Sequence, residues 1–375
     1  MTTHDTPSTT ATTGMVARRP AVGPGRLVAA GAVVLGIVVA IDRLLADRAL
    51  AAEWAPETSW PYAVRSAGIA LASALVVVGG RRLTVARLGE IAAGPPAADR
   101  LRPRFSAGVE QVVAGVGAAV ALGSAVLLIV DPSALSSLVR EDAAVEWASA
   151  LLSFAAGGAV GLSAVRQYRH GGNGAMGRAL VLVAVAGGFL LLGLEEVSWF
   201  QRVLDIESPE AFVNRNGQQE TNLHNFATVA TGNAYYIGAF VFTVAVPHLF
   251  GDRSLGRKLG WLDPVVPPRA VLLASVTAAG IVYEMWNVIW IQAIFWMSLA
   301  ALVTAPARGD GSPRTERLLA AVMIATAAAY IGLGDTMIRA WDDTEVRELV
   351  IPFGLLVYGW AMLRTFCPVD ERQRG

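Results

Sequence analysis

The feature that most constrains this chain is a series of ten apolar runs, separated by short charged or Pro/Gly-rich segments. A helix needs about 20 mostly apolar residues to cross roughly 30 Å of hydrocarbon, and the runs have about this length. We therefore predict an all-α fold, a polytopic transmembrane helical bundle of about ten spans. The predicted spans are residues 27–45, 61–80, 105–130, 143–165, 179–198, 227–250, 270–285, 287–303, 318–338 and 349–366.

Two of these runs need a separate argument, because no strong polar break divides residues 270–303. The roughly forty residues between Arg269 and Arg308 would form a single helix about 60 Å long, which is twice the thickness of the bilayer core. We therefore expect a tight hairpin near residues 284–287, which divides the stretch into two spans.

The composition agrees with this environment, because 54% of the residues are hydrophobic and only 16% are charged. In soluble domains the fraction of charged residues is nearer a quarter. The single cysteine, Cys367, excludes an intramolecular disulfide and any site with several thiolate ligands. The formal net charge of zero gives no indication of a nucleic-acid partner. The lipid bilayer is the partner that the sequence predicts, and the oligomeric state is left open.

The distribution of basic residues predicts the orientation. If the N-terminus is inside, 22 of the 30 Lys and Arg residues fall in the inner segments. The positive-inside rule then places both termini in the cytoplasm. We expect the chain in the plasma membrane. The first run follows three Arg residues and is predicted to be an uncleaved signal anchor. We expect a disordered tail over residues 1–25, a membrane domain over 26–366 and a short cytoplasmic tail over 367–375.

Glycines inside the predicted spans form a second pattern, as at Gly115, Gly117 and Gly123, and at Gly157 and Gly158. Small residues let helix backbones approach closely in lipid. Packing within one chain is the expected use of these residues, and a dimerisation face is the alternative.

Residues 195–226 stand out because they are polar in an otherwise apolar chain. They contain six carboxylates, two Arg and one of only four His residues, and the predicted topology places them on the outer face. Glu195 and Glu196 end a short apolar run, so they are expected at the edge of the hydrocarbon, where charge is costly unless it is paired or hydrated. Neighbouring helical residues point about 100° apart, so one can face the bundle while the other faces the interface. Ser208, Pro209 and Glu210 have the pattern of a helix start, which predicts a short interfacial helix.

The types of polar residue in this segment suggest roles for them. Glu195, Glu196, Glu220 and His224 are candidate catalytic acids and bases. Arg202 suits an anionic headgroup, since guanidinium matches phosphate. The remaining candidate substrate-binding residues are Gln201, Ser198, Trp199, Asn222 and Asn225.

A divalent metal is the cofactor that these residues would suit, because oxygen and imidazole groups are its usual ligands. The candidate ligands are Glu196, Glu220, His224 and Asp335. Glu284 and Asp335 are expected at a similar depth. For both, the end of a helix or a buried hydrogen bond is the alternative to a role in chemistry.

Two blocks of this segment carry a resemblance. Residues 195–202, E-E-V-S-W-F-Q-R, and residues 220–225, E-T-N-L-H-N, are similar to a signature of uncharacterised bacterial and archaeal polytopic membrane proteins. In that family the first block commonly reads E-E-I-S-W-G-Q-R, so Phe200 stands where a small residue is usual. The resemblance implies that both blocks belong to one site, and it implies no activity.

Three functions fit these residues. The first is a hydrolase or transferase that acts on a lipid or lipid-linked substrate at the outer face. The second is a proton- or ion-coupled transporter, in which carboxylates within the membrane bind the coupling ion. The third is a non-catalytic assembly or sensor protein. The sequence does not choose between an enzyme and the other two classes.

Overall fold

The computed structural model describes residues 22–44, 46, 56–57, 59–91, 105–140, 143–172, 174–210, 212, 228–251, 255, 259–305 and 313–367. Every regular element within these residues is a helix, so the predicted all-α class is confirmed. Most of the two predicted tails, and residues 213–227 with Glu220, Asn222, His224 and Asn225, lie outside the described residues.

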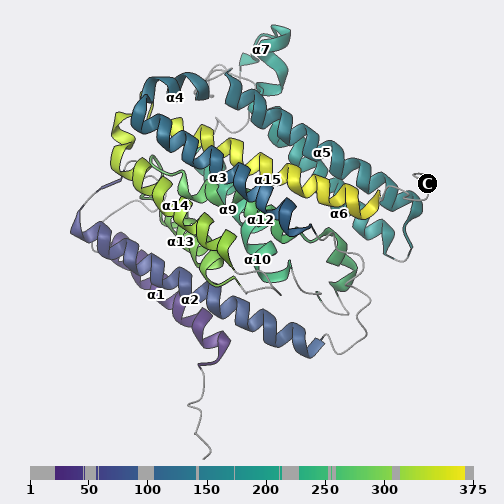
Figure 1. The fold of residues 1–375 in the computed structure, drawn as a ribbon, viewed down its shortest axis with the longest axis horizontal. Helices are drawn as coiled ribbons and strands as arrows, with labels where there is room; N and C mark the ends of the chain where they lie inside the picture. The colour runs from purple at the N-terminus through teal and green to yellow at the C-terminus, as the bar shows by residue number, and fades with distance from the viewer. Residues whose placement is uncertain are drawn as a thin grey trace, which may run out of the picture.

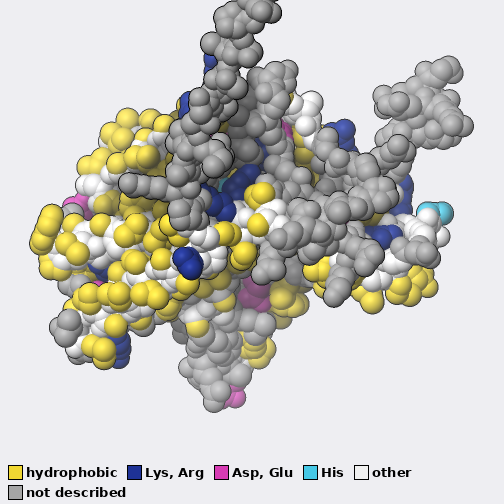
Figure 2. Space-filling view, turned by 90° about the horizontal axis from the view of Figure 1, so that it is seen from below, with side chains coloured by type: hydrophobic (Ala, Val, Ile, Leu, Met, Phe, Trp, Pro, Cys, Tyr) yellow, Lys and Arg dark blue, Asp and Glu magenta, His cyan; other side chains and the backbone are white. Residues whose placement is uncertain are grey.

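Eight helices in the described residues are long and apolar enough to cross a membrane, which is compatible with a multi-pass membrane protein. They are Pro24–Leu44, Trp60–Ala86, Ala107–Val130, Ala144–His170, Ala175–Glu196, Val229–Phe250, Arg314–Thr336 and Asp342–Phe366. In Figure 1 they carry the labels α1, α2, α3, α5, α6, α9 with α10, α14 and α15. Figure 2 shows hydrophobic side chains over much of one described face, on the side where α1 and α2 lie.

The remaining two predicted spans correspond to shorter apolar helices, Arg269–Gly280 and Ile289–Val303. The first consists of α12 (Arg269–Ser275) and the 3-10 turn η6 (Val276–Gly280), and the second is α13 (Ile289–Val303). The predicted turn at residues 284–287 is present. The prediction that helix continues to residue 285 was wrong, because the chain leaves the helix after Gly280. Residues 281, 282, 285 and 288 are buried among other helices, so protein surrounds this irregular backbone.

The first of these short segments forms the centre of the bundle. Residues 270–278 are all buried, and α12 packs against α3 and α15 (Figure 1). Gly117 of α3 makes this close approach possible, since a side chain there would overlap the carbonyl of Ala274. Thr277 Oγ1 also donates a hydrogen bond of 3.1 Å to Gly117 O. Gly157 has a similar role between α5 and α6, whereas a side chain at Gly115 or Gly158 would meet nothing within 4 Å.

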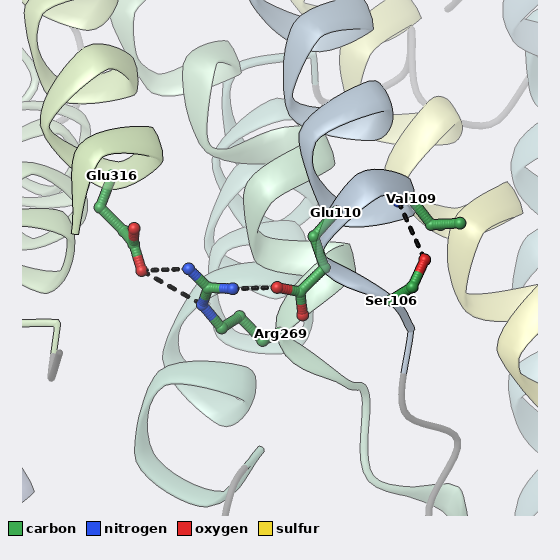
Figure 3. Close-up of polar contacts among 5 residues, drawn as sticks. All are labelled: Ser106, Val109, Glu110, Arg269 and Glu316. Atoms are coloured by element: carbon green, nitrogen blue, oxygen red, sulfur yellow. Dashed lines mark hydrogen bonds and ion pairs between the residues drawn. The ribbon is translucent and has the colours of Figure 1, made fainter. Parts of the chain in front are cut away.

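Polar contacts join the helices at one end of the bundle, which we call the Arg269 end. Arg269, at the start of α12, forms ion pairs with Glu110 in the first turn of α3 and with Glu316 in the first turn of α14 (Figure 3). This Arg269 bridge ties three segments that are far apart in sequence. Its three side chains are mostly buried.

The opposite end, which we call the Glu196 end, collects the loops between α3 and α5, between η6 and α13, and between α14 and α15. A buried ion pair of 2.7 Å links Arg65 of α2 to Asp42 of α1, and Arg65 also donates to Asn287 O. These contacts attach the α1–α2 hairpin to the loop before α13. At the neighbouring loop, Arg339 forms an ion pair with Asp342 and donates to Ser136 O of α4 (Pro132–Val139).

Candidate functional site

The polar segment begins with an unusual backbone. Helix α6 ends at Glu196, and the next residues form the 3-10 turn η2 (Ser198–Phe200) and the one-turn helix α7 (Gln201–Leu204), which stands away from the bundle in Figure 1. Ser198, Trp199 and Phe200 have φ values of 43°, 56° and 60°. Three successive non-glycine residues in the left-handed region are rare, and each costs about 1–2 kcal/mol. The helical backbone is therefore broken between α6 and α7.

Specific contacts hold this backbone in place. Trp199 Nε1 donates a hydrogen bond of 2.8 Å to Glu195 Oε1. The ring of Phe200 stacks on Phe154 of α5, with centroids 5.9 Å apart and planes 12° apart. Gln201 Nε2 donates to Ser208 Oγ. Glu195 and Trp199 thus act together to fix the turn after α6.

Glu196 points in a different direction, into the bundle. Ser149 Oγ of α5 donates a hydrogen bond of 2.9 Å to Glu196 Oε2. Three further carboxylates, Glu146 of α5 and Glu345 and Glu348 of α15, lie close enough to interact electrostatically with Glu196. Two neighbouring glutamates of one helix end therefore have separate environments.

Glu348 extends the group of polar side chains towards α9 (Thr228–Phe240). Tyr236 OH donates a hydrogen bond of 2.8 Å to Glu348 Oε1. The guanidinium of Arg347 lies 4.3 Å from the centre of the Tyr236 ring and donates a bond of 2.8 Å to Asp343 Oδ2. Asp343 also accepts a bond of 2.8 Å from the backbone N–H of Tyr283. We call Glu146, Glu196, Asp343, Glu345 and Glu348 the carboxylate cluster.

The loop between η6 and α13 borders the same group. Burial raises the pKa of the Glu284 carboxyl to about 7, with a further contribution from the charge of Asp343 and an opposing one from Arg347. Burial also raises the pKa of Tyr283, together with the charges of Asp335 and Asp343. Glu284 can therefore exchange a proton near neutral pH, which suits a general acid or base.

A small cavity lies on the other side of Arg347 and Tyr236, towards the middle of the bundle. Its volume is about 40 Å³. The walls come from α9 and the π-helical turn η4 (Val241–Ala245), from α12 and η6, and from α13 and α15. Most of the lining residues are apolar, and the polar ones are Tyr236, Thr243, Ser275, Ser298 and Arg347.

The predicted site residues are described to different extents. Ser198 is buried and Trp199 is 40% exposed. Asp335 lies in the 3-10 turn η7 (Gly334–Thr336) and interacts electrostatically with Tyr283. The side chain of Arg202 lies outside the described part of the structure, as do Glu220, Asn222, His224 and Asn225. Within the described residues no three His, Cys, Asp or Glu side chains form a group that could hold a metal ion. The predicted metal site includes residues beyond this part of the chain.

Sequence reasoning missed Tyr236, Asp343, Arg347 and Glu348. The last predicted span began at residue 349, whereas α15 begins at Asp342 and includes the charged run before it. Carboxylates in a first turn are favoured by the helix dipole, and Asp343 and Arg347 pair at i and i+4. The spacing of charges in this run was the available signal.

Comparison of the chain with known protein families, with curated proteins and with solved structures finds no match.

Proposed function

We propose that this chain is an integral membrane protein with an acid–base site at the Glu196 end, acting as a hydrolase or transferase on a lipid or lipid-linked substrate. One observation carries the proposal: Glu196 is held by Ser149 and interacts electrostatically with three other carboxylates within an apolar bundle. Carboxyl groups whose environments differ can divide the roles of acid and base between them.

The proposed roles of Glu196, Glu348 and Tyr236 rest on their contacts, and those of the remaining residues rest on residue type. Glu196 is the proposed base that takes a proton from the attacking hydroxyl group, and its bond from Ser149 fixes the carboxylate in position. Glu348 and Tyr236 form the neighbouring hydrogen-bonded pair and are the proposed source of the proton for the leaving group. Arg202 is proposed to bind an anionic headgroup, and His224 and Glu220 to complete the site from the second block.

The topology belongs to the same proposal. The Glu196 end is proposed as the outer face of the plasma membrane, with both termini in the cytoplasm and α12–η6 and α13 counted as spans, for a total of ten. A divalent metal bound by Glu196, Glu220, His224 and Asp335 is compatible with oxygen and imidazole chemistry. The resemblance to the family with the two blocks supports a shared site and leaves the reaction to experiment.

The test is turnover of labelled lipids and lipid-linked sugars by the purified protein in liposomes. Glu196→Gln and His224→Ala are each expected to reduce product formation by about 100-fold or more, since general acid–base groups contribute that much. Glu207→Gln, at an exposed position of the same segment, is the control and should retain activity. Unchanged turnover in a folded Glu196→Gln variant would exclude the proposed base.

A second candidate function is proton-coupled transport, and the cavity beside Arg347 and Tyr236 is the observation that favours it. A carrier needs a polar route that continues from the carboxylates into the bundle. Uptake that depends on a pH gradient in proteoliposomes, and that Glu348→Gln abolishes, would support transport. Product formation without a gradient would support the enzyme instead.

A further inference from the structure

The cavity beside Arg347 contains polar groups that the fold does not satisfy. Ser298 is fully buried in α13, and its hydroxyl has no hydrogen-bond partner among the described residues. Arg347 is also buried, and its Nε likewise has none within that part of the chain. Both residues line the cavity. A buried polar group without a partner is costly, so a ligand with hydrogen-bonding capacity is favoured here.

The size of the cavity limits what this ligand can be. One water molecule needs about 10–15 Å³ of such a volume, whereas an apolar cavity that takes benzene measures about 150 Å³. The cavity volume of about 40 Å³ therefore has room for about three water molecules. An acyl chain or a drug-sized molecule would not fit.

The charge of the surroundings favours a neutral ligand. Arg347 is the charged residue in the cavity wall, and its guanidinium already forms an ion pair of 2.8 Å with Asp343. A cation would be repelled by Arg347, and an anion would compete with Asp343 for it. Water can donate to one group and accept from the other, so it fits both Ser298 and Arg347.

The backbone around the cavity is irregular in a way that agrees with hydration. The π-helical turn η4 supplies Thr243 and Val244 to the wall, and the 3-10 turn η6 supplies Val276, Ala278 and Ala279. π-helical turns are frequent at functional sites, and broken helices inside membranes occur where they line a wet cavity.

We propose that this cavity is a hydration site, which holds about three ordered water molecules bonded to Arg347 Nε and Ser298 Oγ. The waters lie behind Tyr236, whose hydroxyl is bonded to Glu348 of the carboxylate cluster. The site is thus a source of water or protons between that cluster and the middle of the bundle. The inference does not depend on the proposed reaction.

Radiolytic labelling tests the proposal, because bound water activated by X-rays oxidises the side chains next to it. In the intact protein in nanodiscs, Tyr236 and Phe240 in the cavity wall should be oxidised at least five times faster than Tyr358. Tyr358 is buried, as Tyr236 is, and does not line the cavity. Ser298→Val, which fills the cavity with apolar atoms, should reduce the rate at Tyr236 and Phe240 by a similar factor. Ser153→Ala changes a buried serine elsewhere and should leave the rates unchanged.

A thermal-unfolding measurement gives an independent outcome. If water satisfies Ser298, Ser298→Ala removes a bonded hydroxyl and should lower the Tm by a few degrees. If the cavity is dry, Ser298→Ala removes an unsatisfied hydroxyl, and the Tm should rise. A rise in Tm, or labelling at Tyr236 no faster than at Tyr358, would overturn the proposal.

Discussion

The hydroxyl of Ser149 lies 2.9 Å from Glu196 Oε2 and donates a hydrogen bond to it across the interface of α5 and α6. This bond joins residues 47 positions apart and fixes Glu196, which belongs to the carboxylate cluster. Glu195, its neighbour, is bonded instead to Trp199. Glu196 therefore contacts the bundle, whereas Glu195 contacts the turn after α6. Substitution of each residue should affect a different part of the structure.

Ser149→Ala is expected to destabilise the fold by about 1–3 kcal/mol, because it leaves a buried Glu196 oxygen without this donor. Unfolding in mixed micelles, followed by tryptophan fluorescence, measures the change. Ser163→Ala is the matched control, since Ser163 is buried in the same helix and its hydroxyl bonds only to the backbone of Ala159. An equal loss of stability in both variants would show that the bond to Glu196 contributes nothing special.

At Phe200 we expect the Gly variant to be more stable than the Ala variant, which is the reverse of the order in a regular helix. The Phe200 φ of 60° lies in the left-handed region, which favours glycine. Phe200→Gly and Phe200→Ala both lose the stacking on Phe154, but only Ala keeps the left-handed strain. Phe200→Gly should therefore be more stable than Phe200→Ala by about 1 kcal/mol.

The control for this pair is Leu151, which is 62% exposed in the regular helix α5. There Leu151→Gly should be less stable than Leu151→Ala by about 1 kcal/mol. The same order of Gly and Ala at both positions would contradict the left-handed turn. Urea unfolding of the four variants provides the comparison.

The sequence predicts some parts of this structure better than others. The long apolar runs follow from hydrophobicity alone, and eight helices bear them out because a chain in lipid must satisfy its backbone hydrogen bonds internally. The turn at Ser198–Phe200 was not predicted, since no glycine marks it and its support comes from Phe154 in another helix. The contact between Tyr236 and Glu348 joins residues 112 positions apart, and no periodicity within one helix encodes it.

Two glycines of α3 should respond to replacement by Ala with opposite changes in stability. Gly117→Ala should destabilise the bundle by about 1–3 kcal/mol, because the new methyl group would overlap the Ala274 carbonyl. Gly115→Ala, two residues away, meets nothing within 4 Å and should raise stability by up to about 1 kcal/mol through helix propensity. Thermal unfolding in detergent distinguishes the two. Equal effects would mean that α3 does not approach α12 at Gly117.

At the Arg269 end, removing Arg269 should lower stability, and also replacing its two glutamate partners should restore most of it. Arg269→Met leaves Glu110 and Glu316 without their shared partner and should cost about 3 kcal/mol, the low end for buried pairs. Replacing both glutamates by Gln in the same chain should restore most of this loss, because no unpaired charge remains. Arg314→Met, at an exposed position near the same end, is the control. A triple variant as unstable as Arg269→Met would show that packing, rather than charge, dominates there.

The last prediction concerns pH and follows from Glu284. Burial raises the pKa of this carboxyl from 4.5 to about 7 in the folded protein, so the folded state binds its proton more tightly than the unfolded state does. The unfolded chain releases that proton near pH 4.5, and the folded chain releases it near 7. Stability should therefore fall as pH rises between these values and level off above them. The loss is at most about 3 kcal/mol, and smaller because the side chain is partly exposed.

Glu284→Gln should match the native Tm near pH 4.5 and exceed it at pH 8. Glu57→Gln, at an exposed position, is the control, and a Glu284→Gln difference that does not change between pH 4.5 and 8 would contradict the shift.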